Sequence, residues 1–337
     1  MRIGVFYQDP KKIVEAYPND CQGRDTLLPH ISIKKALEAR GHEVILMDIA
    51  ARHYSEYRNE KVDCIFNLCD EGIEGNAYFE PHAAAILDTY HVPYTGSDFL
   101  TLGLCLRKGI TKEIIWYHKI PTPTFQIITH ADEVISPKLT FPLIVKPTRE
   151  DGSIGIRMTS VVNTPEDLHT QVLHILSEYK QPALIEQYIE GREINVSVIG
   201  HGESATALPV SEILFDGFPK GYPRICSYEA KWLTDSIFYH KTKPQCPANV
   251  PPAMAKKIQK TALKLYNIFE CRDYARVDFR VDNLGRAYVL EFNPNPDISE
   301  DAGLANAART IGMSYSDLIE NIIKSAIDRW KTKSLRD

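Results

Sequence analysis

The chain has 337 residues, and its 39 lysines and arginines against 44 aspartates and glutamates give a formal net charge of −5. Hydrophobic residues make up 44% and charged residues 25%, as in soluble globular proteins, so a mainly disordered or fibrous chain is excluded. No apolar run approaches the roughly 20 residues of a membrane span, and the first residues do not resemble a signal peptide. The net charge gives no reason to expect nucleic acid or an anionic membrane as a partner.

The seven cysteines are scattered along the chain, and none belongs to a C-x-x-C motif. An odd number without that motif predicts neither a disulfide framework nor a thiolate zinc site. The pattern favours structural cysteines in the reducing cytoplasm, which is the localisation we expect. The length favours two or three domains.

The first hundred residues alternate between strand and helix patterns. Strands are expected at 3–7, 42–48 and 63–68, and helices at 31–40 and 81–90. Strands that alternate with helices at this spacing form βαβ units. We therefore predict a Rossmann-like parallel sheet and assign residues 1–98 to an N-terminal domain.

The middle of the chain, residues 99–191, is predicted to form a second domain. Its expected elements are a helix at 100–118, a strand at 141–146, a helix at 165–179 and a strand at 183–188. The first of these strands runs into a glycine-containing segment at 147–156.

The last part, residues 192–337, is predicted to be a third domain of mixed α+β type in a chain of α/β class. Its expected elements are antiparallel strands at 194–199 and 205–210, a helix at 253–268, a hairpin of strands 274–281 and 287–292, and helices at 302–311 and 315–330. The stretch 216–252 has weak periodicity and is too long for a routine connection, so we predict a functional flap there.

The most informative segment is the predicted hairpin and the sequence N-P-N-P that follows it. Arg276 and Asp278 share one face of the first strand, and Glu291 and Asn293 share one face of the second. Pairing would bring two carboxylates and an amide oxygen together, and such hard oxygen ligands suit Mg²⁺ that bridges nucleotide phosphates. A solvated face with ordinary ion pairs is the alternative, but the complete cluster favours the metal site.

Two further segments are weak evidence for a nucleotide site when each is taken alone. Lys146 ends a predicted strand and precedes a glycine- and serine-bearing turn, which could hold phosphates with one charge and several backbone N–H groups. Glu186 and Glu193 flank a short loop whose backbone could bind adenine, while a carboxylate could bind ribose hydroxyls. The P-loop and the dinucleotide-binding glycine motif are both absent from the sequence.

Taken together and in this order, the three segments resemble the ATP-grasp superfamily and, more closely, the D-alanine–D-alanine ligase family. Three more blocks are similar to that family, PYTGSD at 93–98, RKGITK at 107–112 and GMSYSDLI at 312–319. The resemblance extends from about residue 63 to residue 326, and it implies an ATP-grasp fold behind the N-terminal sheet.

The resemblance implies a role for each residue that matches a family motif. Lys108 and Lys146 would contact ATP phosphates, and Lys231 would reach the γ-phosphate from the flap. Adenine would be framed by Glu186, Gln187 and Ile189, and Glu193 would hold the ribose.

The same resemblance implies the metal ligands and the catalytic groups. Asp278, Glu291 and Asn293 would bind two Mg²⁺ ions, for which Mn²⁺ could substitute. Arg276 would stabilise the acyl phosphate, and Lys231 and Ser153 complete the catalytic set.

The chain departs from the family mainly where amino acids would bind. Gly152 replaces the first of two serines in the phosphate loop, Trp232 replaces the tyrosine after the flap lysine, and Ala302 replaces the serine that would hold the second substrate's carboxylate. The N-terminal glutamate block and the histidine of the H-G-x-x-G-E-D-G block are missing as well. Three acids near the acceptor end, Asp297, Glu300 and Asp301, would favour a cationic acceptor, or would merely face solvent.

These observations predict an ATP-dependent carboxylate–amine ligase that joins two amino-acid-like small molecules through an acyl phosphate and releases ADP and phosphate. A true D-alanine–D-alanine ligase with a divergent pocket is one alternative, and a non-catalytic ATP-binding module is another. The resemblance also suggests a homodimer, because members of the family often form one.

Overall fold

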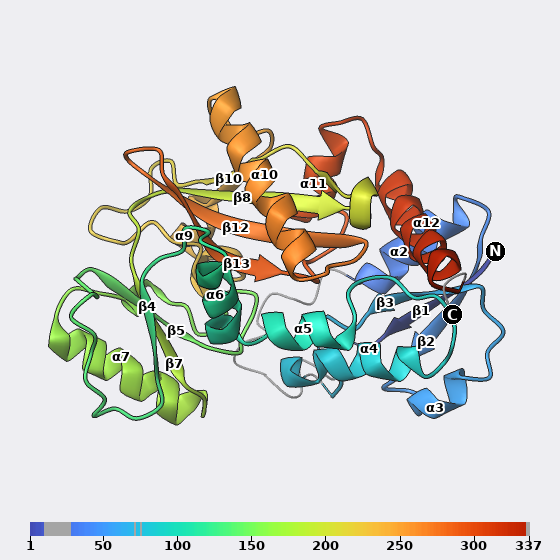
Figure 1. The fold of residues 1–337 in the computed structure, drawn as a ribbon, viewed down its shortest axis with the longest axis horizontal. Coiled ribbons are helices and arrows are strands. Elements are labelled where there is room, and N and C mark those ends of the chain that lie inside the picture. Colours follow the sequence, from blue (N-terminus) through green and yellow to red (C-terminus); the bar gives the residue numbers. More distant parts are fainter. Residues whose placement is uncertain (10–27, 71, 75, 335–337) are drawn as a thin grey trace.

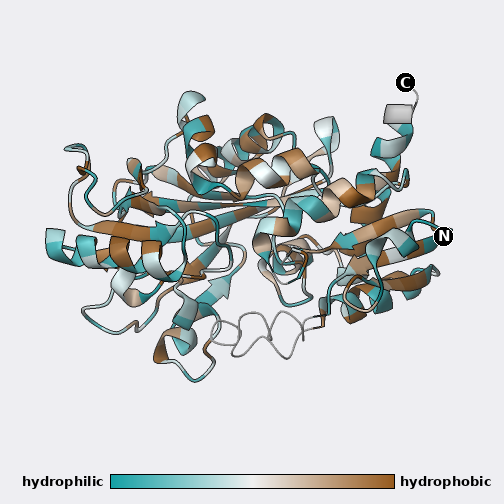
Figure 2. Ribbon diagram, turned by 90° about the horizontal axis from the view of Figure 1, so that it is seen from below, coloured by the Kyte–Doolittle hydropathy of each residue, from teal (hydrophilic) through white to brown (hydrophobic). Residues whose placement is uncertain are grey.

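The computed structural model describes residues 1–9, 28–70, 72–74 and 76–334, and it has three sheets within these ranges (Figure 1). Hydrophobic and hydrophilic segments occur along both the strands and the long helices (Figure 2). No helix in these ranges combines the length and the apolar composition that a membrane span requires. The fold class predicted from the sequence, an α/β chain with an N-terminal parallel sheet, is confirmed.

The N-terminal sheet is parallel and has the strand order β2-β1-β3. Its strands are β1 (Arg2–Tyr7), β2 (Glu43–Asp48) and β3 (Cys64–Leu68). One face packs against α2 (Pro29–Glu38) and the C-terminal helix α12 (Tyr315–Ser334), and the other packs against α3 (Tyr54–Tyr57) and α4 (Glu80–Asp88). The carboxyl ends of β1 and β3 open onto a large cavity, as is usual for binding sites on parallel sheets.

The second sheet is antiparallel and has the order β4-β7-β5-β6. Its strands are β4 (Phe125–Ile128), β5 (Leu143–Pro147), β6 (Val161–Val162) and β7 (Ala183–Gln187). Alternate side chains of β5 and β7 pack against α7 (Pro165–Glu178), while the others line the cavity. This period of two carries Lys146 and Glu186 to the cavity side of the sheet.

The third sheet runs in the order β11-β10-β8-β12-β13, and β9 pairs with β8 beside this path. Its strands are β8 (Gly191–Ile199), β9 (Thr206–Ala207), β10 (Ser211–Leu214), β11 (Lys243–Gln245), β12 (Tyr274–Asp282) and β13 (Ala287–Asn293). Helix α10 (Pro252–Ile268) packs on one face, and the other face lines the cavity. The remaining elements are α8 (Tyr228–Lys231), α9 (Ile237–His240), α11 (Gly303–Arg309), and the 3₁₀ turns η1 (Ala77–Phe79), η2 (Met158–Ser160) and η3 (Gly202–Ser204).

Two expectations about single elements are wrong. The helix expected at 100–118 is two helices, α5 (Phe99–Cys105) and α6 (Lys108–Tyr117). The break lets the backbone N–H of Lys108 donate to the carbonyl of Thr148, so α6 begins at the cavity. The strand expected at 205–210 shortens to β9, because Pro209 cannot donate to a ladder.

Candidate active site

A cavity of about 1110 Å³ lies between the second and third sheets and is bordered by the carboxyl ends of β1 and β3. Pockets that bind one drug-sized ligand have volumes of roughly 300–1,000 Å³. The cavity is therefore large enough for a nucleotide together with a second small molecule. Residues from all three sheets line it, and so do both the glycine-containing loop after β5 and the segment expected to form the flap.

The hairpin of β12 and β13 brings together the residues expected to bind metal. Asp278 lies directly opposite Glu291, and Arg276 lies opposite Asn293. The register shifts after this pair, so that Phe279 pairs with Val289 and leaves Leu290 as a bulge. Bulges re-aim side chains, and here Leu290 and Glu291 both line the cavity while Val289 is buried in the core.

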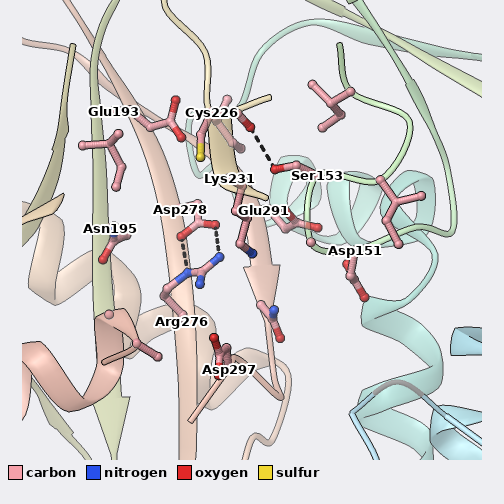
Figure 3. A pocket seen from close by; sticks show the side chains of 18 of the residues that line it. Asp151, Ser153, Glu193, Asn195, Cys226, Lys231, Arg276, Asp278, Glu291 and Asp297 are labelled. Carbon is pink, nitrogen blue, oxygen red and sulfur yellow. Dashed lines mark hydrogen bonds and ion pairs between the residues drawn. The ribbon is translucent and has the colours of Figure 1, made fainter. Parts of the chain in front are cut away.

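Two carboxylates opposite each other on one face repel, and cations stabilise both of them. Arg276 holds Asp278 with two hydrogen bonds of 2.7 Å, from Nε to Oδ1 and from Nη2 to Oδ2 (Figure 3). Lys108 donates to Glu291 Oε1 and, over 3.1 Å, to Asp151 Oδ1. Burial alone would raise the pKa of Glu291, but Lys108 and the cations near it lower that pKa to about 2.

The donor set at this hairpin fits Mg²⁺ by its chemistry. It offers two carboxylates and the amide oxygen of Asn293, whose Oδ1 accepts a 2.8 Å hydrogen bond from the backbone N–H of Asn295. Within the part of the chain that the structure describes, no group of three or more His, Cys, Asp or Glu side chains is placed to hold a metal ion, so the set depends on the amide oxygen of Asn293 as well as on the two carboxylates. A hard cation here would compete with Arg276 and Lys108 for the carboxylates.

Glu186 lies at the bottom of the expected nucleotide site. Its carboxylate is 1% exposed and forms ion pairs with Lys112 and, at 2.6 Å, with Lys146. Burial alone would raise the pKa of Glu186, but the two lysines lower it below its usual value. Glu186 therefore contacts the expected phosphate lysine directly, which the sequence did not indicate.

The other residues expected around the nucleotide also reach the cavity. Gln187, Ile189 and Glu193 all line it. The Gln187 side chain is turned to the segment before β5, where its Nε2 donates to the Pro142 carbonyl, and its backbone N–H donates to the Thr124 carbonyl over 2.9 Å. Glu193 lies 3.4 Å from Arg280, and burial raises its pKa.

The segment 216–252 closes over the glycine-containing loop after β5. Ser153 Oγ donates to the Cys226 carbonyl over 2.8 Å, and Trp232 Nε1 donates to the Gly152 carbonyl over 2.7 Å. Lys231 reaches the cavity beside them, with its Nζ 4.8 Å from the centre of the Trp232 ring (Figure 3). We call the Trp232–Gly152 bond the indole latch, and it joins two of the positions at which the sequence departs from the family motifs.

The loop that the latch holds depends on a glycine. Gly155 has a φ of +74°, and a Cβ there would lie 2.7 Å from the side chain of Pro147. A side chain at this position would be strained and would clash. The loop can therefore keep close to the end of β5, where Lys146 lies.

The end of the cavity at which the sequence predicts the second substrate contains several acids. Glu80 is buried, accepts a 2.7 Å hydrogen bond from Asn295 Nδ2, and has its pKa raised well above the usual value, chiefly by burial. Asp297 and Asp301 line the cavity near Ala302. Glu300, which we grouped with these two acids, is exposed and lies outside the lining.

Comparison with known proteins identifies the family. A family model described as the D-ala D-ala ligase C-terminus matches residues 116–324. The chain belongs to the D-alanine–D-alanine ligase family. A D-alanine–D-alanine ligase from Ralstonia nicotianae is 32% identical over 72% of this chain and 69% of its own, and the uncharacterized protein y4sG from Sinorhizobium fredii is 38% identical over 79% of this chain and 75% of its own.

A solved structure shares the fold of this D-alanine–D-alanine ligase family member. The crystal structure of a D-alanine–D-alanine ligase from Bacillus anthracis in complex with ATP covers 99% of both chains, with a TM-score of 0.75 and 23% sequence identity. Family and fold together make this chain a D-alanine–D-alanine-ligase-like, ATP-dependent enzyme that forms a C–N bond.

Three residues in or next to the cavity wall were not assigned a place there from the sequence. Leu290 reaches the cavity only because of the bulge, which no motif marks. Asp151 was placed in the phosphate loop, but its contact with Lys108 was not foreseen. Lys112 lies one helical turn after Lys108, and this i, i+4 spacing could have indicated a second inward-facing lysine.

Proposed function

We propose that this ligase activates the carboxylate of one amino-acid-like substrate as an acyl phosphate and joins it to the amine of another, with D-alanine not the preferred substrate pair. A carboxylate oxygen attacks the γ-phosphorus of ATP and ADP leaves. The amine nitrogen then attacks the acyl carbon, phosphate departs with the C–O bonding electrons, and the nitrogen loses a proton. A carboxylate needs this activation because it is a poor electrophile.

The observation that carries the proposal is a set of exchangeable ion pairs facing one cavity. Asp278 is held by Arg276, and Glu291 is held by Lys108. In the presence of magnesium and ATP, each cation can exchange a carboxylate for a phosphate while each carboxylate turns to the metal. The total charge of the site is then balanced before and after binding, so neither state leaves an unpaired charge.

We assign the nucleotide to the space between the second and third sheets. Lys108 and Lys146 would bind phosphates, the backbone at Gln187–Ile189 would bind adenine next to Glu186, and Glu193 would bind ribose. Leu290 and Ile144 add apolar surface for the base. Asp278, Glu291 and Asn293 would hold Mg²⁺, which neutralises phosphate charge when bound.

Two residues would act on the transferred phosphoryl group, and a third would hold the loop and flap closed over it. Lys231, brought by the flap, and Arg276, on β12, would balance the charge that develops as the γ-phosphoryl moves to the carboxylate. Ser153 would hold the loop and flap together over the phosphates through its bond to Cys226. Closure of residues 216–252 would keep water from the acyl phosphate.

The substrate preference rests on the groups that replace the family's hydroxyls. A buried hydrogen-bonding group left without a partner costs roughly 1–3 kcal/mol, and a charged carboxylate or ammonium costs more. Gly152 and Ala302 lack hydroxyl groups, and Trp232 uses its only donor in the indole latch. Asp297 and Asp301 at the cavity wall favour an acceptor with an additional positive charge over one that presents a carboxylate there.

A second candidate function is D-alanine–D-alanine ligation itself, which the names of several relatives favour. A non-catalytic ATP-binding module is less well supported, because binding alone does not require Arg276 in addition to the three metal-binding residues.

The proposal is tested by measuring phosphate release from Mg-ATP with pairs of D- and L-amino acids, including diamino acids. We expect a pair other than two D-alanines to give the highest rate, and a product with a new amide bond by mass spectrometry. If D-alanine alone, at low millimolar concentration, is as fast as any other amino acid, the D-alanine assignment replaces ours. If no pair accelerates phosphate release, amino acids are the wrong class of substrate.

A further inference from the structure

Lys112 is a buried cation to which the proposed chemistry gives no role. It lies on α6 one turn after Lys108, and only 2% of its side chain is exposed. Its ammonium forms an ion pair with Glu186 and donates to Thr122 Oγ1 over 2.9 Å. Lys112 does not line the cavity, so it is not placed to touch a ligand there.

Glu186 is shared between this hidden lysine and a lysine that faces the cavity. Its Oε1 pairs with Lys112, and its Oε2 pairs with Lys146 at 2.6 Å. Lys146 is 12% exposed and lines the cavity. One carboxylate between two ammonium groups leaves a surplus of one positive charge, and the surplus is located on the side open to ligand.

We propose that Lys112 is a positioning residue that neutralises Glu186 from behind and thereby leaves the charge of Lys146 available to nucleotide phosphates. This inference rests on the proposed function, because it requires Lys146 to bind phosphate. Without Lys112, Glu186 and Lys146 would form a closed one-to-one pair. A phosphate would then have to break that pair before it could bind.

A second set of contacts connects Lys112 to the opposite wall of the cavity. Thr122 Oγ1, which accepts from Lys112, donates to the Val289 carbonyl over 2.8 Å, and the Val289 N–H donates to the Pro121 carbonyl over 2.8 Å. Val289 immediately precedes the bulge that turns Leu290 and Glu291 to the cavity. Lys112 therefore links the strand that carries Glu186 with the strand that carries the metal-binding carboxylate.

The charge of Lys112 itself depends on this arrangement. Burial lowers the pKa of Lys112, whereas Glu186 raises it, and the net direction is downward. An apolar side chain of similar length would avoid the burial cost if the role were only to fill space. A lysine at this buried position, in contact with Glu186, is explained if that carboxylate must be neutralised.

The test separates charge balance from packing by a double-mutant comparison. Lys112→Met removes the hidden charge, and Lys112→Met with Glu186→Gln removes both charges and leaves Lys146 its surplus. Isothermal titration calorimetry with ADP and with adenosine, in the presence of Mg²⁺, measures binding to each variant and to the wild type. Lys257→Met, at an exposed lysine on α10, is the matched control.

We expect Lys112→Met to weaken ADP binding at least tenfold and adenosine binding less than threefold, and the double variant to bind ADP at least threefold more tightly than Lys112→Met alone. Equal ADP affinity in Lys112→Met and the wild type, or equally weak binding by the single and double variants, would overturn the inference. If Lys112→Met does not fold, Lys112→Gln, which keeps a hydrogen-bond donor, replaces it under the same criteria. Failure of the wild type to bind ADP would instead contradict the proposed function.

Discussion

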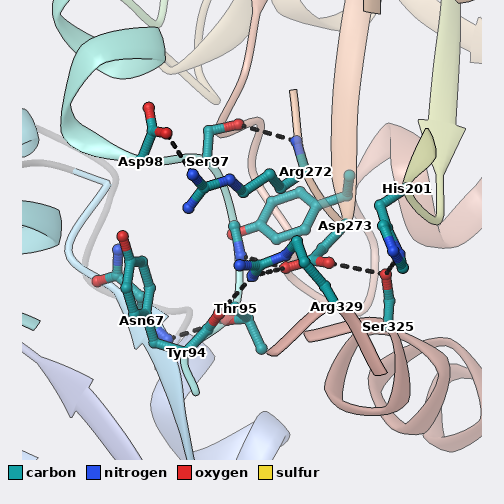
Figure 4. A network of polar contacts seen from close by, with 12 residues as sticks. Asn67, Tyr94, Thr95, Ser97, Asp98, His201, Arg272, Asp273, Ser325 and Arg329 are labelled. Carbon is teal, nitrogen blue, oxygen red and sulfur yellow. Dashed lines mark hydrogen bonds and ion pairs between the residues drawn. The ribbon is translucent and has the colours of Figure 1, made fainter. Parts of the chain in front are cut away.

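Two buried charge clusters of this ligase use the same interactions for different purposes. The cavity cluster consists of Lys108, Asp151, Arg276, Asp278 and Glu291. The second, which we call the Asp273 network, consists of Gly96, Asp273, Ser325 and Arg329. Figure 3 shows Arg276, Asp278 and Glu291, and Figure 4 shows Asp273, Ser325 and Arg329. Both pair carboxylates with basic side chains. They differ in access, because Asp273 is fully buried whereas Glu291 is 32% exposed and lines the cavity.

The Asp273 network satisfies both oxygens of its carboxylate within the protein. Asp273 Oδ1 accepts from Ser325 Oγ over 2.7 Å, and Oδ2 accepts from the Gly96 N–H over 2.9 Å and from Arg329 over 3.0 Å. Arg329 also donates to the Tyr94 carbonyl. The network joins the segment beside β3, the residue before β12 and helix α12, so it fixes the N-terminal sheet to the rest of the molecule.

The comparison shows that an ion pair can exchange one of its partners for a ligand only where the pair borders open space. In the cavity cluster, every ion pair borders space that a ligand can fill, and a bound phosphate or metal can replace one partner. In the Asp273 network, any displacement would leave a buried charge unpaired, which is strongly destabilising. We therefore expect substitutions in the first cluster to reduce turnover and substitutions in the second to reduce stability.

The largest expected effect is on turnover in Glu291→Gln. Loss of one carboxylate from the expected metal site should lower kcat on the order of 10³-fold, because charge stabilisation in the transition state depends on it. Phosphate release with the best substrate pair measures kcat, and thermal unfolding shows that the fold survives. Glu113→Gln, at an exposed position on α6, is the control. Near-normal turnover in Glu291→Gln would contradict the metal assignment.

Asp273→Asn should have the opposite effect and reduce stability more than turnover. We expect it to lower the free energy of unfolding by about 3 kcal/mol, because Arg329 then keeps a buried charge without its carboxylate. Asparagine tolerates the left-handed conformation at this position, where φ is +64°, so backbone strain is not the cause. Urea denaturation measures the change, and Asp328→Asn, exposed on α12, is the control. A kcat loss without a stability loss would show that the two clusters are not distinct.

The sequence predicted the shared face of the hairpin residues in the cavity cluster, but it predicted neither the bulge beside them nor the Asp273 network. Arg276, Asp278, Glu291 and Asn293 could be placed because two alternating strands and a short turn determine which side chains share a face. The bulge at Leu290 could not, since it depends on how β13 packs against α6 and the segment before β4. The Asp273 network was not foreseen either, because its members come from three distant segments and belong to no motif.

Removing the indole latch should have a smaller effect. It tests whether the bond from Trp232 to Gly152 keeps residues 216–252 closed over the cavity cluster. Trp232→Phe keeps an aromatic ring beside Lys231 but removes the donor to Gly152. A neutral hydrogen bond contributes about 0.5–1.5 kcal/mol, so cleavage by protease within residues 216–252 should become up to about tenfold faster. A non-hydrolysable ATP analogue should slow cleavage in both proteins. Trp116→Phe, on the exposed part of α6, is the control, and an unchanged cleavage rate in Trp232→Phe would remove the latch from the account of flap closure.

The smallest effect concerns stability in acid. It compares the pH dependence of the free energy of unfolding of the wild type with that of a variant that lacks the charge of Glu186. Lys112 and Lys146 hold the folded-state pKa of Glu186 below its usual 4.5, although burial opposes them. A lowered carboxyl pKa contributes stability that is complete above about pH 4.5 and disappears as the pH falls through the folded value. The free energy of unfolding of the wild type should therefore decline more steeply below pH 4.5 than that of the Lys112→Met, Glu186→Gln double variant. Urea denaturation at a series of pH values between about 6 and 3 measures both slopes. Parallel slopes would mean that Glu186 is not held charged by the two lysines, and the closed side of the nucleotide site would then need another explanation.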